Sequence, residues 1–364
     1  MLKKMIKKND SGIELINSEL KYLLSLTSES EINVLFAKAR AIKHSFSGKD
    51  VYLRGLIELS NICVKDCFYC GIRKSNSNFE RFTLSKEDVY DCTEFAFKNN
   101  FASLVIQAGE RQDEEFVDFI EELLIQIKKK TNSKLRVTLS LGEQKEETYQ
   151  RWYNAGAHRY LLRIETTNQK LFNEIHPKEY CFKARMNCLY SLKKLGYQLG
   201  TGVLIGFPDQ TAADLIKDIQ FFKDIDVDMI GMGPYLPHKN TPMGAPIINK
   251  FSDSAIKERT LLGLKMIAVT RIYLKNVNIA STTALQTLDP EFGLERGLLA
   301  GANVIMPNVT DVKYKKSYLL YDNKTCFEGD LKSMLDQLNN RIEKIGERIA
   351  FNKWGDSVHF LNKQ

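Results

Sequence analysis

Three cysteines stand close together in the sequence: Cys63, Cys67 and Cys70. Thiolates at this C-x3-C-x2-C spacing can bind three irons of a 4Fe-4S cube, which leaves the fourth iron without a protein ligand. The amino and carboxylate groups of S-adenosylmethionine (SAM) can chelate that iron, and one electron from the cluster then cleaves the sulfonium to give methionine and a 5′-deoxyadenosyl radical. The motif therefore predicts a radical-generating enzyme, in which Tyr69 would lie beside the SAM adenine.

Two plainer interpretations of these cysteines compete with the cluster. A structural zinc site would need a fourth ligand, and no further Cys or His stands at the usual spacing nearby. Three small buried side chains are the second alternative, but a window of eight residues is short for such a coincidence. The other cysteines are scattered and are interpreted as core or surface residues: Cys92, Cys181, Cys188 and Cys326.

The composition describes a large globular chain. Its 364 residues are 43% hydrophobic, which suits one barrel-sized domain with extensions. The net charge of +7 comes from 52 basic and 45 acidic residues spread along the chain, a pattern that predicts no nucleic-acid partner. The sequence shows neither a signal peptide nor a run of about 18 apolar residues, and scattered cysteines in a long chain suit a reducing compartment. We therefore expect a cytoplasmic protein with no membrane partner.

Apolar runs that end in Gly, Pro or polar residues alternate with segments of helical periodicity. Eight such units predict an α/β fold, a closed (β/α)8 barrel of the TIM type, better than an open doubly wound sheet. A barrel of six units is the alternative. The expected strands are 51–60, 103–109, 136–142, 159–166, 199–208, 229–237, 276–285 and 302–310, and the expected helices are 85–99, 114–130, 145–155, 168–195 with a break at Pro177, 211–224, 252–274 and 291–300.

Both ends of the chain extend the barrel. Residues 13–46 predict helices within an N-terminal extension over 1–50, and 329–348 predict an amphipathic helix within a C-terminal extension over 311–364. The barrel itself then covers 51–310. Because no shift in composition marks a boundary, we expect both extensions to pack on the barrel.

Polar side chains share one face of several expected strands. On the fourth strand Arg159, Arg163 and Glu165 alternate with apolar residues, so these three point the same way. Charged residues inside a barrel are costly to bury unless they meet each other or a ligand. The polar residues expected to share this inward placement are Gln107, Thr138, Ser140, Thr282 and Thr283. We expect one polar cavity, near the carboxyl ends of the strands.

With these features together, the sequence resembles the radical SAM superfamily and, within it, the biotin synthase-like group and the HydE family of FeFe-hydrogenase maturases. The resemblance covers most of the barrel. The segments that carry it are RGLIELSNICVKDCFYCGIRKSN (54–76), QAGE (107–110), TLSLGE (138–143), RYLLRIET (159–166), MIGMGPYLPHKNTPM (229–243), ASTTA (280–284) and AGANVIMPN (300–308).

The resemblance implies which residues bind SAM. Gly109 and Glu110 match a GGE-type element that binds the amino group of SAM, although Ala108 replaces its first glycine. Glu165 matches the position that binds the ribose. The remaining matches are Arg163 and Arg185 near the carboxylate, and Met229 with the turn 231–235 beside the adenine. The residues that would face a second ligand, deeper in the barrel, are Gln107, Thr138, Arg159, Thr282 and Thr283, with Tyr314 or Tyr318 as a further candidate.

The resemblance also implies a reaction. HydE-type enzymes take an iron-carbonyl-cyanide species that carries cysteine and, through a radical that acts on sulfur, convert it toward the di-iron subcluster of FeFe-hydrogenase. The alternatives are a methylornithine synthase-like mutase and a non-enzymatic iron-sulfur carrier, which would not need a polar barrel interior. We expect a single cluster, because the region that holds a second one in some family members offers only Cys326. The expected partners are a small-molecule or iron-complex substrate, a flavodoxin- or ferredoxin-like electron donor and other hydrogenase maturases, under anaerobic conditions.

Overall fold

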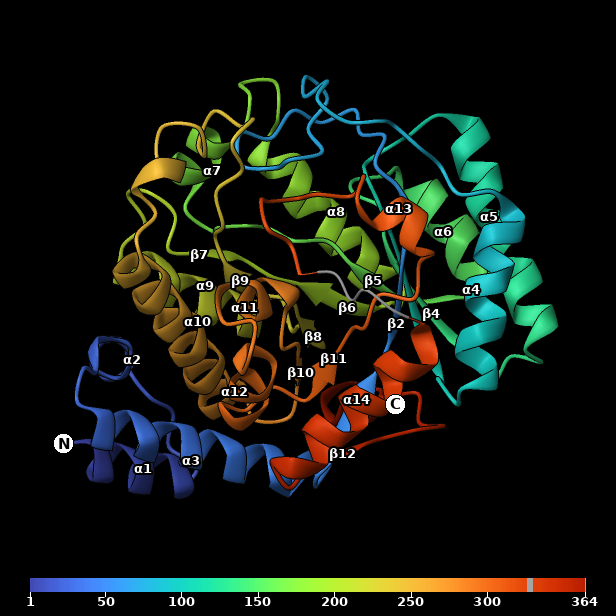
Figure 1. Cartoon of the computed structure of the whole chain (residues 1–364). Helices are drawn as coiled ribbons and strands as arrows, with labels where there is room; N and C mark the ends of the chain where they lie inside the picture. Colours follow the sequence, from blue (N-terminus) through green and yellow to red (C-terminus); the bar gives the residue numbers. More distant parts are fainter. Residues whose placement is uncertain (326–329, 364) are drawn as a thin grey trace.

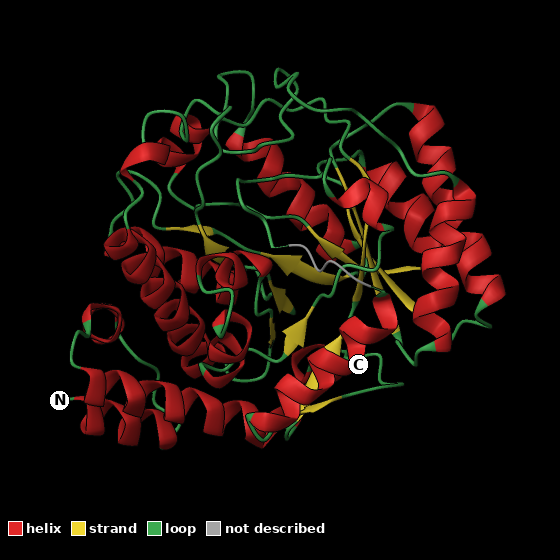
Figure 2. Cartoon of the chain, viewed as in Figure 1, coloured by secondary structure: helices red, strands yellow, loops and turns green. Residues whose placement is uncertain are grey.

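The computed structural model describes residues 1–325 and 330–363. Its centre is a curled sheet of seven parallel strands in the order β10-β8-β6-β5-β4-β3-β2 (Figures 1 and 2). These strands are β2 (Gly55–Ser60), β3 (Ser103–Ala108), β4 (Arg136–Ser140), β5 (Ala157–Leu161), β6 (Gln198–Thr201), β8 (Met229–Ile230) and β10 (Asn278–Ile279). A short parallel pair, β7 (Leu204–Ile205) and β9 (Gly233–Pro234), follows β6 and β8 along the chain. Every one of these strands overlaps a segment that the sequence predicts as a strand.

The sheet closes on itself through β11 (Val304–Ile305). β11 pairs in parallel with β1 (Asp50–Leu53), which runs almost directly into β2, and Tyr52 lies opposite Val304. On the other side an isolated bridge joins Ala280, just after β10, to Val304. The strands therefore form a ring of eight positions, so the predicted (β/α)8 barrel is confirmed and the six-unit alternative is wrong.

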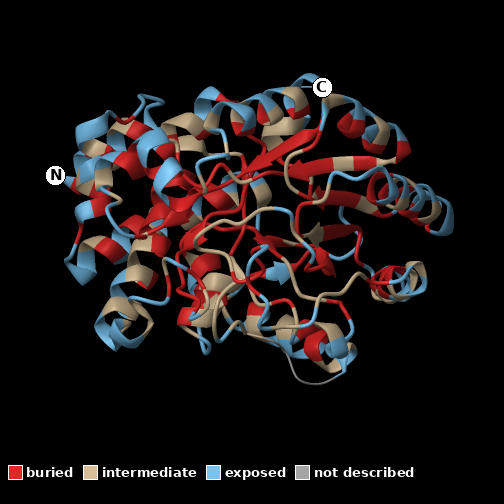
Figure 3. Cartoon of the chain, turned by 90° about the horizontal axis from the view of Figure 1, so that it is seen from above, coloured by how far each residue is buried: buried red, intermediate tan, exposed pale blue. Residues whose placement is uncertain are grey.

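Helices form the outer layer, and their apolar faces are buried against the sheet while their outer faces are exposed (Figure 3). Several begin at a side chain that caps the first turn: Ser85, Asp113 and Thr211 accept backbone N–H groups of α4, α5 and α9. The predicted break at Pro177 separates α7 from α8. The layer consists of α4 (Lys86–Lys98), α5 (Glu114–Lys130), α6 (Glu146–Ala155), α7 (Gln169–Ile175), α8 (Phe182–Lys194), α9 (Ala212–Asp224), α10 (Asp253–Leu274) and α12 (Gly293–Leu299), with a 3-10 turn at Ile248–Lys250.

Two segments differ from the prediction. The expected strand 276–285 ends early, and α11 (Thr283–Leu288) takes its place. Leu285 and Leu288 are both buried, and three residues is a helical spacing rather than a strand spacing. The charged N-terminus also forms a helix, α1 (Leu2–Asp10), in which the buried Leu2 and Met5 make a short inward stripe.

The two extensions meet each other on the barrel. The helices α2 (Asn17–Ser25) and α3 (Glu29–Ser47) pack on α10 (Figure 1). Lys43 of α3 forms a 2.6 Å ion pair with Glu347, and both side chains are fully buried. The C-terminal part contributes α13 (Val312–Lys315), α14 (Leu331–Lys344), β12 (Arg348–Ile349), which pairs with β1, and α15 (Val358–Leu361). Along the described residues, no helix is long and apolar enough to cross a membrane.

A C-terminal segment around Asp356 fills the end of the barrel where the strands begin. Asp356 forms an ion pair with Arg159 and accepts a hydrogen bond from Gln198 Nε2 at 3.0 Å. The carbonyl oxygen of Gly355 accepts one from Asn278 Nδ2 at 2.8 Å. Gln198 and Asn278 are the first residues of β6 and β10. The chain therefore closes this lower end of the barrel with its own polar groups.

Candidate active site at the carboxyl ends of the strands

The loop that carries the three cysteines follows β2 and lies over the upper end of the barrel. Backbone hydrogen bonds tie it to several other segments, among them Val64 N–H to the Glu110 carbonyl at 2.9 Å. Phe68 N–H donates to the Ile175 carbonyl at 3.0 Å, and Gly71 N–H donates to the Leu320 carbonyl at 2.8 Å. The Phe68 carbonyl accepts from Met243 N–H at 3.1 Å. The loop is therefore a bonded roof over the barrel interior.

Arg81 holds this loop from within. Its guanidinium donates to the carbonyl oxygens of Asn61, Ile72 at 2.8 Å, Arg73 at 2.6 Å and Asn76 at 2.9 Å. A planar guanidinium with five donors suits such a cluster of acceptors. Sequence reasoning missed Arg81, because bonds to backbone carbonyls leave no pattern in the side-chain types around it.

The three cysteines of this loop are half-buried. Burial raises the pKa of all three thiols, to about 12 for Cys70, so their thiolate forms need a cation to stabilise them. Among the described residues, no three His, Cys, Asp or Glu side chains converge closely enough to share one metal ion. A 4Fe-4S cube makes a different demand, since each thiolate binds its own iron. The cysteines therefore fit a cluster better than a single zinc ion.

The end of β3 supports the first cysteine. Glu110 N–H donates to Cys63 Sγ at 3.3 Å, a contact of the kind that tunes a cluster through its sulfur ligands. A Cβ on Gly109 would lie 2.3 Å from the Ile62 carbonyl oxygen and 2.7 Å from Cys63 Cβ, so only glycine leaves room for the loop. This close approach gives a physical reason for the glycine that the sequence analysis singled out.

Charged residues beside the loop bind one another. Glu143 accepts hydrogen bonds from Arg185 Nε at 2.5 Å and from Lys65 Nζ at 2.9 Å. Glu110 lies 3.3 Å from Lys65 and accepts a bond from Glu143 N–H at 2.9 Å. Burial and the nearby carboxylate of Glu143 raise the pKa of Glu110. Burial also opposes ionisation of Glu143, but Arg185 and Lys65 hold the pKa of Glu143 below its ordinary value. Because Lys65 lies inside the cysteine motif, this network fixes the position of the loop. Sequence reasoning missed two of its members, Lys65 and Glu143.

A cavity of about 300 Å³ lies under the roof, and several residues expected from the sequence line it. Gln107 Nε2 donates to the hydroxyl of Tyr318 at 3.2 Å. Tyr314 instead donates to Asp88 of α4 at 3.0 Å, so Tyr318 is the tyrosine of the two that adjoins the cavity. The expected residues on the cavity wall are Tyr69, Gln107, Ser140, Arg163, Glu165, Thr282 and Thr283, together with Gly231 and Gly233 to Tyr235 of the turn. Glu110 and Arg185 lie outside this wall, in the network described above.

Glu165 is the most constrained residue of the cavity. Its φ is +67°, in the left-handed region that non-glycine residues rarely adopt, and such strain concentrates at functional sites. Its carboxylate accepts a bond from the Tyr69 hydroxyl at 3.4 Å and lies 3.0 Å from Arg163 Nη2. Burial raises the pKa of Glu165, against the opposing effect of Arg163 and Arg185. His176 adjoins Tyr69 at 3.5 Å, and burial lowers the pKa of this histidine to about 3, so it is neutral.

Four buried polar atoms around the cavity have no hydrogen-bond partner in the part of the chain that the structure describes. They are Arg163 Nε, Glu165 Oε2, Tyr235 OH and Thr282 Oγ1. Glu165 Oε2 is close to Arg163, but the two are not aligned as a hydrogen bond. Buried polar groups are normally satisfied, since each unmade bond destabilises the fold. The four atoms include both hydrogen-bond donors and hydrogen-bond acceptors, so they fit a polar ligand such as SAM, with its hydroxyl and amino-acid groups.

The structure places Arg159 away from this cavity, contrary to the prediction. Arg159 is fully buried at the lower end, where Asp356, Ser103 at 2.9 Å and the Trp354 carbonyl oxygen at 2.7 Å occupy its guanidinium. It stands four residues before Arg163, which is about 13 Å along an extended strand. The two arginines share the inward face but not the height in the barrel.

Thr138 and Met229 are displaced from the predicted cavity for the same reason. Thr138 is fully buried in the interior, where its hydroxyl has no hydrogen-bond partner in the described part of the chain, and Ser140, two residues later, lines the cavity instead. Met229 lies at the start of β8, where its sulfur accepts a hydrogen bond from Arg54, and Gly231 lines the cavity in its place. Of the other cysteines, Cys92 is buried, Cys188 half-buried and Cys181 exposed, while Cys326 lies outside the described residues.

Comparison with known proteins identifies relatives of this fold and site. The family described as the radical SAM superfamily matches residues 57–222. The [FeFe] hydrogenase maturase subunit HydE of Thermotoga maritima is 39% identical over 344 residues, which cover 94% of each chain. The 3-methylornithine synthase of Methanosarcina acetivorans is 26% identical over 345 residues, 93% of this chain and 91% of that protein. A crystal structure of methylornithine synthase superposes with a TM-score of 0.79 at 22% identity, covering 95% of this chain and 97% of that chain, and shares the fold.

Proposed function

The chain belongs to the radical SAM superfamily, and we propose that within it the chain works as a HydE-type maturase, in assembly of the di-iron cluster of FeFe-hydrogenase. Membership of the superfamily makes it an enzyme that cleaves SAM reductively at a 4Fe-4S cluster. The observation that carries the finer proposal is 39% identity to HydE across 94% of both chains, against 26% for 3-methylornithine synthase over a similar length.

Cys63, Cys67 and Cys70 would hold the cluster. When bound, cluster and SAM together supply an electron and a reactive adenosyl carbon. The protein's own task is to keep water and stray hydrogen donors away. The bonded roof over the cavity and the buried wall beneath it serve that task, because the loop is tied to segments at Ile175 and Leu320.

We assign the SAM-binding role to the upper wall of the cavity. Glu165 would accept from the ribose hydroxyls, since its Oε2 has no hydrogen-bond partner among the described residues. Arg163 would meet the carboxylate with its free Nε, while Arg185 positions Arg163 by donating to its carbonyl oxygen. Tyr69 would lie beside the adenine. Gly109 and Glu110 would support the amino group from beside the first cysteine.

A second ligand would lie further from the roof. Gln107, Thr282 and Thr283 offer amide and hydroxyl groups there, with no unpaired charge among them. These groups suit an iron complex that carries cysteine, whose carbonyl, cyanide and amino-acid groups need hydrogen bonds more than a full countercharge. A flavodoxin- or ferredoxin-like protein would supply the electron.

Anaerobic reconstitution tests this proposal. The reduced holoenzyme is incubated with SAM and either the iron-cysteine complex or lysine, and adenosyl products are identified by mass spectrometry. We expect the iron complex, and not lysine, to raise SAM consumption and to give an adenosylated product. A lysine-derived product would overturn the maturase proposal in favour of an amino-acid mutase, and no SAM cleavage under either condition would favour a carrier. Iron near four per chain would accord with one cluster, whereas a value near eight would refute it.

A further inference from the structure

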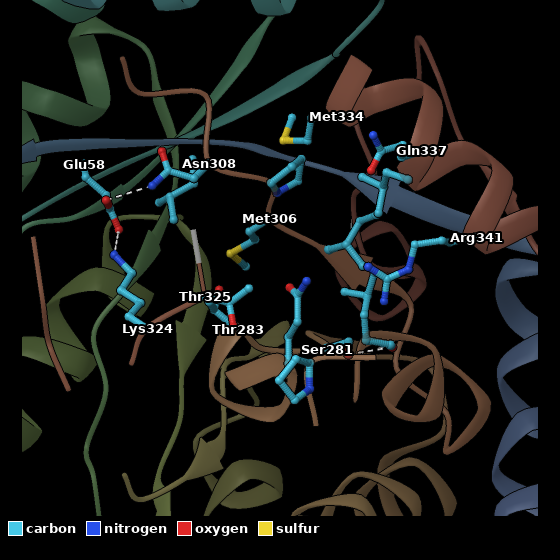
Figure 4. Close-up of a pocket in the computed structure, with 17 residues that line it drawn as sticks. Glu58, Ser281, Thr283, Met306, Asn308, Lys324, Thr325, Met334, Gln337 and Arg341 are labelled. Carbon is cyan, nitrogen blue, oxygen red and sulfur yellow. Dashed lines mark hydrogen bonds and ion pairs between the residues drawn. The ribbon is translucent and has the colours of Figure 1, made fainter. Parts of the chain in front are cut away.

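A second, larger cavity of about 510 Å³ adjoins the first (Figure 4). It lies between the end of β11, α11 and α14, on the flank of the barrel. The two cavities share part of their wall: Leu56, Glu58, Ser281, Thr283, Met306 and Lys324 line both. The side cavity and the barrel cavity are therefore neighbours across one shared wall.

The central element of the shared wall is an ion pair between Glu58 and Lys324. The Glu58 side chain is 1% exposed and that of Lys324 is 6% exposed. Asn308 Nδ2 donates to the second oxygen of Glu58 at 2.8 Å, which fixes the carboxylate on β2. Lys324 also donates to the Tyr318 carbonyl oxygen at 2.9 Å. Both partners of the ion pair are thus anchored, the carboxylate by Asn308 and the lysine by the Tyr318 carbonyl oxygen.

The far side of the side cavity reaches the surface. Gln337 of α14 lines the cavity and is exposed to solvent, and Arg341 lies one turn further along the same helix (Figure 4). Arg341 forms an ion pair with Glu295, in which Arg341 Nη2 donates to Glu295 Oε2 at 2.8 Å. Every charged side chain that the structure describes on this wall is therefore paired. The remaining wall is amide, hydroxyl and apolar, including Met306 and Met334, which suits a small molecule with both polar and apolar groups.

We infer that the side cavity is the passage by which the second ligand reaches the barrel, beside the Glu58–Lys324 ion pair of the shared wall. The cysteine loop is bonded across the upper end, and SAM would lie beneath it, so a second molecule needs another route. Asp356 and its neighbours close the lower end. The flank beside Glu58 is where two cavities meet. The inference requires only SAM cleavage and does not depend on the maturase proposal.

A neutral deuterium donor tests the passage. Reconstituted holoenzyme cleaves SAM in the presence of perdeuterated 2-propanol, and mass spectrometry reports deuterium in the 5′-deoxyadenosine formed. Gln337→Trp at the outer mouth, or Gln286→Trp on α11, narrows the side cavity without touching the barrel cavity. We expect each to lower deuterium incorporation about fivefold while total 5′-deoxyadenosine stays within about twofold of wild type.

Asn340→Trp is the matched control, because Asn340 is exposed on α14 and lines neither cavity. The 5′-deoxyadenosine formed by Asn340→Trp should contain as much deuterium as that formed by wild type. If Gln337→Trp and Gln286→Trp both incorporate deuterium as wild type does, the proposed passage is wrong.

Discussion

Both ends of the barrel interior hold arginine and carboxylate side chains, but the hydrogen bonding of these side chains differs between the two ends. At the lower end Arg159 meets Asp356, and Asn278 donates to the Gly355 carbonyl oxygen. At the upper end Arg163 and Glu165 lie together but leave buried atoms without hydrogen bonds among the described residues. Among the described residues, two buried atoms at the lower end, Arg54 Nε and Arg136 Nε, lack a hydrogen-bond partner, against four around the upper cavity, and we propose that a ligand satisfies those four.

This difference distinguishes side chains that stabilise the fold from side chains that are available to bind a ligand. A buried charge destabilises a protein unless other groups satisfy it, so a satisfied arginine is an internal tie. Arg54, at the lower end, shows the rule with one exception: its two terminal nitrogens reach Met229 Sδ and the Gly355 carbonyl oxygen, and only Nε stays unpartnered. At the upper end Glu165 combines a left-handed backbone conformation with a buried carboxylate oxygen that has no hydrogen-bond partner among the described residues, a combination expected of a ligand site rather than of an internal tie.

The largest effect should come from the upper end. Cys67→Ala removes one of three cluster ligands, so we expect 5′-deoxyadenosine formation from SAM to fall to the no-enzyme background. The thermal midpoint of the cluster-free chain should stay within about 2 °C of wild type, because the loop is held by Arg81 and by backbone bonds. Cys181→Ala, at an exposed cysteine, is the control and should retain full activity. Persistent SAM cleavage by Cys67→Ala would remove the cluster from this loop.

The lower end should respond in stability instead. Asp356→Asn leaves the fully buried Arg159 without its countercharge, and we expect a loss of about 3 kcal/mol in the free energy of unfolding. SAM cleavage per folded molecule should not change. Asp336→Asn, on the exposed face of α14, should shift stability by less than about 0.5 kcal/mol. A stable Asp356→Asn variant with impaired SAM cleavage would reverse the roles of the two ends.

Acid should weaken the lower end in a predictable direction. Burial opposes ionisation of Asp356, but the hydrogen bond from His158 and the charge of Arg159 hold the pKa of that carboxyl well below its usual range. Its contribution to stability is therefore complete above the unfolded pKa of about 4 and is lost as the pH falls toward the folded value. The stability gap between wild type and Asp356→Asn, measured on the cluster-free chain, should narrow by about 1 kcal/mol from pH 7 to pH 3. A constant gap would contradict the assigned ion pair.

The smallest effect on the free energy of unfolding is expected for Thr138, which lies between the two ends. Thr138→Val removes a buried hydroxyl that has no hydrogen-bond partner among the described residues, so the free energy of unfolding should be unchanged or rise by up to about 1 kcal/mol. Thr201→Val is the matched comparison, because Thr201 Oγ1 donates to the Leu162 carbonyl oxygen at 2.8 Å. That variant should lose about 1 kcal/mol in a denaturant titration. Equal losses in both variants would indicate that Thr138 has a bound partner.

Sequence patterns predicted the barrel, its strands and which side chains face inward. They could not predict height along the barrel axis, since strand alternation repeats every second residue and treats Arg159 and Arg163 alike. The partner that distinguishes the two, Asp356, lies 197 residues after Arg159 in the sequence. Lys65 and Glu143 were missed for a related reason, because their pairing joins the ends of two separate strand-loop units.

We propose that SAM binds to the upper-end groups that lack hydrogen-bond partners among the described residues. The SAM dissociation constant of reconstituted Glu165→Gln tests this binding most directly, with Glu147→Gln on the exposed face of α6 as control. We predict binding about tenfold weaker for Glu165→Gln, at unchanged iron content, because one charged acceptor is lost. The control should bind as wild type does. A dissociation constant for Glu165→Gln equal to that of wild type would contradict the account.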